Sequence, residues 1–185
     1  MDALLRRIGS ESGLILIVAI AMLAIALPIV LWRIRSGEGA LPAAWKTGLE
    51  GAILGSVAVI VALTLGAFAT GGQGQINWVP FQSLFDSLAL GEFWIGIVMT
   101  DLLGNFLLFI PIGLVVGLRF AQARIWVWAA VVVAFTSAIE IAQFLVLNRS
   151  ADTTDVVMNG LGGIAGFVIA RTLQRLLSPA KEWEL

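Results

Sequence analysis

Long runs of hydrophobic residues, separated by short polar connections, dominate this chain. Five of these runs approach the ~20 residues that an α-helix needs to cross a bilayer. They predict an all-α fold, a polytopic membrane helix bundle that forms a single transmembrane domain over residues 1–185. The predicted spans cover residues 13–32, 49–69, 93–118, 125–147 and 156–177.

Residues 70–92 form the longest connection without a spanning pattern. From Phe81 onward its hydrophobic residues recur at steps of three and four, which predicts a short amphipathic helix lying in the membrane interface. Two interpretations stay open, namely a lid over polar groups of the bundle and a simple connector. The candidate lid or interface residues are Asn77, Trp78, Pro80 and Phe81.

Lysine and arginine predict the orientation of the bundle, because cytoplasmic connections carry an excess of them. Eight of the eleven basic residues would lie on one side of the membrane if all five spans cross it. The carboxyl terminus is then cytoplasmic, and residues 70–92 and the amino terminus face outward. Arg6 and Arg7 oppose the amino-terminal assignment, which a half-inserted first helix would reconcile. Six tryptophans fall near predicted span ends, as an interfacial belt would: Trp32, Trp45, Trp78, Trp94, Trp126 and Trp128.

The composition supports a membrane protein and excludes several kinds of chemistry. Hydrophobic residues make up 59% of the chain and charged residues only 12%, about half the charged fraction of soluble domains. The absence of cysteine and histidine excludes disulfides, Ser-His-Asp catalysis and zinc sites of the usual kind. No basic stripe with interleaved aromatic residues suggests nucleic acid, and no motif calls for a cofactor.

Polar residues within three of the predicted spans are expected to converge at one depth. Because the third and fourth spans run in opposite directions, their polar positions both fall in the outer leaflet, near the connection to the fifth span. An ionisable residue inside a spanning helix is by default a functional-site hypothesis. The candidate ligand-binding residues are Asp101, Asn105, Glu140, Gln143, Arg149, Asp152, Asp155 and Asn159.

The alternative is a polar network that only fixes the register of the helices. In that interpretation Asp152 caps the fifth span, Arg149 pairs with Asp152 or Asp155, and Glu140 bonds to Asn159. The charge count weighs against it, since four acidic residues would face one arginine. Such an excess in a low-dielectric setting must be protonated, hydrated or neutralised by a cation.

Pairs of glycines predict where the spans pack closely. Gly162 and Gly166 in the fifth span have the spacing that lets membrane helices approach, and Gly113 and Gly117 repeat it in the third. Pro111, between those positions, is expected to open the hydrogen-bond ladder of the third span.

Three blocks of the sequence resemble the VanZ-like family of small bacterial membrane proteins: INWVPF, NFLLFIPIGLVVG and SAIEIAQFLVLNRSADTTDVVMNGLGGIAGF. The matching positions are Asn77, Pro80, Phe81, Asn105, Phe109, Pro111, Gly113, Glu140, Gln143, Arg149, Asp152, Asp155, Asn159, Gly162 and Gly166. The resemblance implies a multi-pass protein of the bacterial cell membrane. It also implies a link to glycopeptide resistance, because the namesake lowers sensitivity to teicoplanin, a lipoglycopeptide that acts at the outer face. A general role in the cell envelope is the alternative, since the family name carries no settled biochemical activity.

Two functional hypotheses of different classes follow. In the first, the outer polar residues bind the head of a membrane lipid, a lipid-linked cell-wall precursor or a lipoglycopeptide, with Arg149 on a phosphate or carboxylate. In the second, the protein is an enzyme that acts on a lipid-linked substrate. Glu140 or Asp155 would then be the general acid or base, beside a carboxylate-bound magnesium or calcium ion. No nucleophile stands out.

Overall fold

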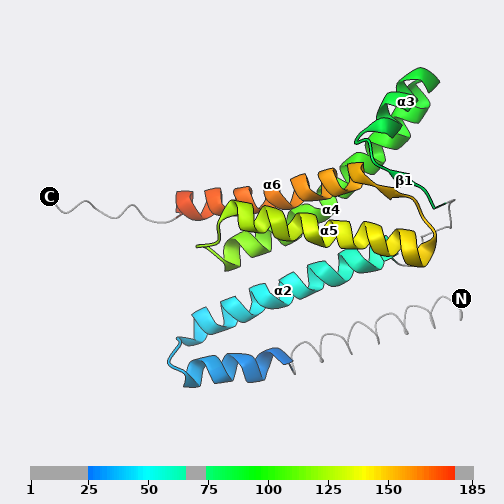
Figure 1. Ribbon diagram of the computed structural model, residues 1–185. Coiled ribbons are helices and arrows are strands. Elements are labelled where there is room, and N and C mark those ends of the chain that lie inside the picture. The colour runs from blue at the N-terminus through cyan, green and yellow to red at the C-terminus, as the bar shows by residue number, and fades with distance from the viewer. Residues whose placement is uncertain (1–24, 66–73, 178–185) are drawn as a thin grey trace, which may run out of the picture. The chain divides into compact units, whose positions relative to one another are not determined.

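The computed structural model describes residues 25–65 and 74–177, and the all-α prediction is confirmed. Within these residues, four helices are long and apolar enough to cross a membrane: α2 (Ala40–Leu65), α4 (Glu92–Arg119), α5 (Ile125–Leu147) and α6 (Thr153–Leu177). A shorter helix, α3 (Gln82–Leu90), precedes α4. Two short strands, β1 (Ile76–Asn77) and β2 (Ala151–Asp152), lie in the connections (Figure 1).

The predicted span boundaries agree closely with three helices and less well with the others. α4, α5 and α6 each begin within three residues of the predicted start, and α3 begins just after Phe81. α2 begins at Ala40 rather than near residue 49, because its alanines favour helix while Lys46 and Thr47 interrupt the apolar run that predicted the span. Most of the first predicted span lies outside the described residues, although residues 25–35 are helical.

The described residues divide into two compact units between Gly51 and Ala52, so the boundary falls within α2. In the first unit, Arg33 donates from Nη2 to both carboxylate oxygens of Glu50, at 2.8 and 2.9 Å. Lys46 forms an ion pair with Glu38 at 3.0 Å. Basic residues of the first connection are thus partly neutralised by acidic residues of the same unit.

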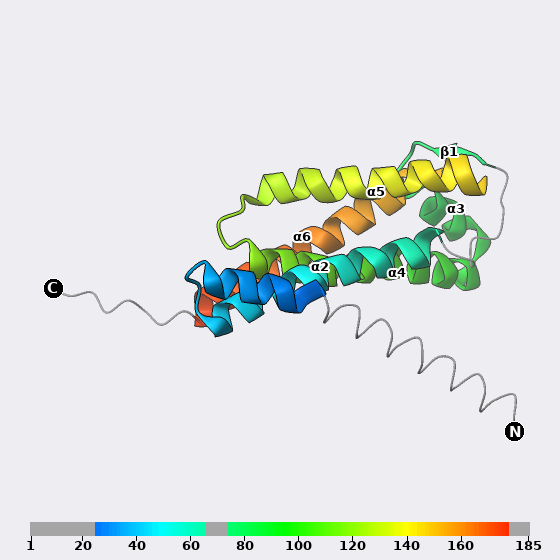
Figure 2. The same ribbon diagram turned by 90° about the horizontal axis from the view of Figure 1, so that it is seen from below.

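In the second unit, α4, α5 and α6 run alongside one another, as Figures 1 and 2 show. α6 packs more extensively against α4 than against α5. The α4–α5 turn and the end of α6 lie at one end of these helices, whereas β1, β2 and the start of α6 lie at the other. The apolar core of this unit contains Ile60 of α2, Phe109 of α4, Val132 and Ile139 of α5, and Phe167 of α6.

Glycines form the closest part of the α4–α6 contact, as their spacing predicted. A Cβ atom added to Gly162 would overlap the backbone carbonyl oxygen of Phe106, and one added to Gly166 would overlap that of Ile110. On α4, a Cβ at Gly113 would overlap the carbonyl oxygen of Gly163. The two backbones therefore touch directly, which is the arrangement that small residues permit in membrane helices.

Trp128 does not belong to an interfacial belt, and that expectation was wrong for this residue. Its side chain is only 7% exposed, whereas the neighbouring Trp126 is 64% exposed. The Trp128 indole stacks on Phe167 and donates from Nε1 to the carbonyl oxygen of Gly163 at 2.9 Å. Gly163 has no side chain to shield its carbonyl oxygen on α6, so the Trp128 indole of α5 can reach it. This hydrogen bond and the stacking on Phe167 hold the indole inside the bundle.

Candidate functional site

A two-residue parallel bridge joins the segment before α3 to the connection between α5 and α6. Ile76 lies opposite Ala151 and Asn77 opposite Asp152, and the amide of Ala151 donates to the carbonyl of Gln75 at 2.9 Å. The Asn77 side chain donates from Nδ2 to Asp152 Oδ2 at 3.1 Å. Segments about 75 residues apart in sequence are therefore joined at the end of the bundle where the polar residues were predicted.

Two threonines at the start of α6 extend this attachment. Thr153 donates its hydroxyl to the carbonyl of Asn77, and the Thr154 hydroxyl accepts from the amide of Phe81, both at 2.9 Å. Residues 76–81 consequently lie against the start of α6. Helix α3 itself contacts α4 and leaves Phe85 and Leu88 exposed, so its role as lid or as connector stays a prediction.

Asp152 organises the entry into α6. Its Oδ1 accepts from the amide of Thr154 at 2.7 Å, which satisfies one of the free amides at the helix start, as predicted for a cap. The backbone amide of Asp152 donates in turn to Glu140 Oε2 at 2.9 Å. Glu140 is only 6% exposed, and a backbone donor from the next connection partly offsets the cost of burying it.

Gln143 holds the end of α5. Its backbone carbonyl accepts from Asn148, which has a positive φ of 51°, and from Arg149 at 3.2 Å. Its side chain donates from Nε2 to the carbonyl of Thr64, at the end of α2, at 3.0 Å. The buried amide group of Gln143 therefore connects two helix ends.

Asparagines link α6 to both neighbouring helices. Asn105 on α4 donates from Nδ2 to Asp155 Oδ1 at 2.7 Å. Asn159, which is 2% exposed, donates from Nδ2 to the hydroxyl of Thr136 at 2.8 Å rather than to Glu140. Its Oδ1 has no partner among the described residues. The helix-register network suggested by the sequence is thus present in part, with Thr136 in the place expected of Glu140.

Arg149 differs from these residues in its contacts. It is half-buried and interacts electrostatically with Asp101, Glu140 and Asp155. Within residues 25–65 and 74–177, however, its guanidinium forms no side-chain hydrogen bond and no ion pair, so the predicted pairing with Asp152 or Asp155 is not observed. Among the described residues, Arg149 is therefore near its acidic neighbours without being bound by them.

Asp101 and Asn105 line an open groove beside α4, with a volume of about 440 Å³. Ile97, Thr100 and Gly104 complete its lining. Asp101 is exposed, whereas the Asn105 side chain is engaged with Asp155. The groove therefore combines one available carboxylate with apolar helix surface.

A family model described as VanZ/LLP1 matches residues 51–174, which contain every residue of this site. The chain belongs to the VanZ/LLP1 family. It is 30% identical over 94 residues to "Protein VanZ" of Enterococcus faecium, and the match covers 51% of each chain, about half the length of that relative. No solved structure matches the chain.

The polar site of this VanZ/LLP1 protein presents hydrogen-bonding groups and the guanidinium of Arg149. No three acidic side chains in the described parts of the chain gather closely enough to hold a metal ion. Sequence reasoning missed three hydroxyl groups of the site, those of Thr136, Thr153 and Thr154. The position of Thr136 one turn before Glu140 was the available signal, because it places both side chains on one helix face.

Proposed function

We propose that the polar end of the bundle binds the head of an amphiphilic envelope molecule, which is a membrane lipid, a lipid-linked cell-wall precursor or a lipoglycopeptide. The observation that carries this proposal is the environment of the Arg149 guanidinium. Its guanidinium lies among acidic residues but has no hydrogen-bonded partner in the described part of the chain. An anionic group of a ligand would complete this cluster, because guanidinium binds phosphate and carboxylate through two parallel hydrogen bonds.

The other polar residues divide into those that build the site and those that remain available. Asp152 and Glu140 hold the α5–α6 connection through the bonds described above, so they position Arg149. Asp101 is exposed in the groove and can accept hydrogen bonds from hydroxyl or amide groups of a head group. The two residues together suit a ligand head that carries an anion and several donors.

The apolar part of such a ligand has a surface to lie on. Leu103 and Leu107 follow Asp101 along α4, and both are exposed. In a membrane protein this surface faces lipid tails, so a lipid-linked ligand could keep its tail in the bilayer while its head enters the groove. The basic residues at the opposite end of the bundle support an outward-facing site, by the positive-inside rule.

Native mass spectrometry of the protein in mild detergent tests this proposal. Teicoplanin and a lipid-linked cell-wall precursor serve as added probes, and co-purified membrane lipids are recorded in the same spectra. We expect Arg149→Ala to weaken binding of at least one of these species about 10- to 100-fold, the value of one charge-assisted hydrogen-bond pair. Arg149→Lys should lose part of the affinity, because it retains the charge but not the paired donors.

Arg124→Ala is the matched control, since it removes an exposed arginine at the other end of the bundle. A ligand bound equally by the native protein, Arg149→Ala and Arg124→Ala would refute the proposal. The cluster would then be a structural network, and Arg149→Ala would be expected to change only the melting temperature.

A further inference from the structure

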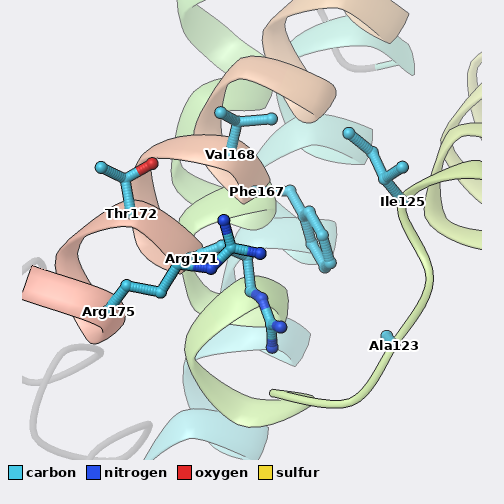
Figure 3. A pocket seen from close by; sticks show the side chains of 7 residues that line it. All are labelled: Ala123, Ile125, Phe167, Val168, Arg171, Thr172 and Arg175. Carbon is cyan, nitrogen blue, oxygen red and sulfur yellow. The ribbon is translucent and has the colours of Figure 1, made fainter. Parts of the chain in front are cut away.

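A second cavity lies at the opposite end of the bundle, away from the polar site. It has a volume of about 280 Å³ and lies between the end of α6 and the start of α5. Figure 3 shows the side chains of Arg171 and Arg175 close together there, with Phe167 beside them and Ala123 and Ile125 across the cavity. None of these residues belongs to the Arg149 site.

The two arginines form a like-charged pair without an observed counter-charge. They are four residues apart on α6, so they project from one face of the helix, where like charges repel. Across residues 25–65 and 74–177, no acidic side chain forms an ion pair with either guanidinium. An anion bound between the two guanidinium groups would attract both of them and so offset their mutual repulsion.

Two further groups at the cavity favour an anion. α5 begins at Ile125, which lines the cavity, so the positive end of the α5 dipole lies beside it. Thr172 also lines the cavity. Whereas the hydroxyls of Thr64 and Thr100 donate to carbonyls one turn back, that of Thr172 has no hydrogen bond within the described residues.

The surroundings of the cavity indicate where the anion comes from. Val168 in the lining and Trp126, Leu173 and Leu176 nearby in sequence are exposed apolar residues. A tryptophan at a helix end is typical of the membrane interface. The cavity therefore lies where phosphate groups of lipids occur, with apolar helix surface available for their chains.

We propose that this cavity binds the phosphate of an anionic phospholipid, in the leaflet that contains the Arg171 end of the bundle. Arg171 and Arg175 bind the phosphate oxygens, and Thr172 donates its hydroxyl to the same group. Basic pockets between transmembrane helices are suited to such head groups. The site is independent of the Arg149 site, so either can fail without the other.

The test uses the full chain in nanodiscs of phosphatidylcholine that contain phosphatidylglycerol. Native mass spectrometry counts the phosphatidylglycerol molecules that stay bound after release from the disc. We expect Arg171→Gln to reduce retention about tenfold, the effect of one lost charge-assisted hydrogen bond. Thr172→Val, which keeps the shape and both charges, should reduce it about threefold through the loss of a neutral hydrogen bond.

Arg35→Gln is the charge-matched control, because Arg35 is an exposed arginine that does not line the cavity. Equal retention by Arg171→Gln and Arg35→Gln would overturn the proposal, since binding would then follow net charge alone. Competition with inorganic phosphate distinguishes the two sources of the anion. Displacement of phosphatidylglycerol by inorganic phosphate at equal concentration would assign the cavity to a soluble phosphate and overturn the lipid assignment.

Discussion

Replacement of Gly162 by alanine should separate α4 from α6 at the level of the polar site. The added methyl group would overlap the carbonyl oxygen of Phe106 and lie 2.9 Å from its carbonyl carbon and 3.2 Å from its Cα. These distances are shorter than the ~3.5 Å at which carbon atoms pack best. All three atoms belong to the backbone, so no side-chain rotation can relieve the overlap.

The expected cost is that of an overpacked core, about 1–3 kcal/mol. For a chain of this size, each kcal/mol lowers the melting temperature by roughly 2–4 °C, so the variant should melt about 2–12 °C lower. Asn105 adjoins Phe106 and donates to Asp155 at 2.7 Å, so the same movement lengthens that hydrogen bond. We therefore expect Gly162→Ala to weaken ligand binding at the Arg149 site as well.

Thermal unfolding in detergent, followed by circular dichroism, measures the effect. Gly96→Ala is the control, because a Cβ at that position on α4 meets no atom within 4 Å. An alanine there should be neutral or stabilise the helix by about 0.5–1 kcal/mol. If Gly162→Ala melted at or above the temperature of Gly96→Ala, the direct backbone contact between α4 and α6 would be refuted.

Two further predictions concern the core and the topology. Trp128→Phe should destabilise the protein by about 1–2 kcal/mol in the same thermal assay, because it removes the hydrogen bond to Gly163 and leaves a void. The control Trp126→Phe should change little, because Trp126 is exposed. Equal effects of the two substitutions would contradict a stabilising role of the buried Trp128 side chain. The native chain has no cysteine, so Gln82→Cys and Ala121→Cys, both at exposed positions, can report sidedness. We expect an impermeant thiol reagent to label the first and not the second in intact cells, and the reverse result would invert the orientation.

Much of the helical architecture could be predicted because hydrophobic length is a local property. α5 ends at the predicted residues, and the α4 boundaries differ from the prediction by one residue at each end. The two-residue strands could not be predicted, since a pair such as Ile76–Asn77 is too short to show an alternating pattern. Their pairing joins distant segments, and no local pattern in a single chain specifies such a contact.

The candidate site was predictable in its location but not in its contacts. The sequence by itself determined that Glu140, Arg149 and Asp155 lie at one level, because helix rise and span direction set their depth. Only the tertiary structure decided their partners: Glu140 accepts from the Asp152 backbone amide, Asp155 accepts from Asn105, and the Arg149 guanidinium donates to no acceptor among the described residues. A hydrogen bond requires atoms within about 3 Å and a suitable angle, and this geometry depends on how closely the glycines of α4 and α6 allow the helices to approach.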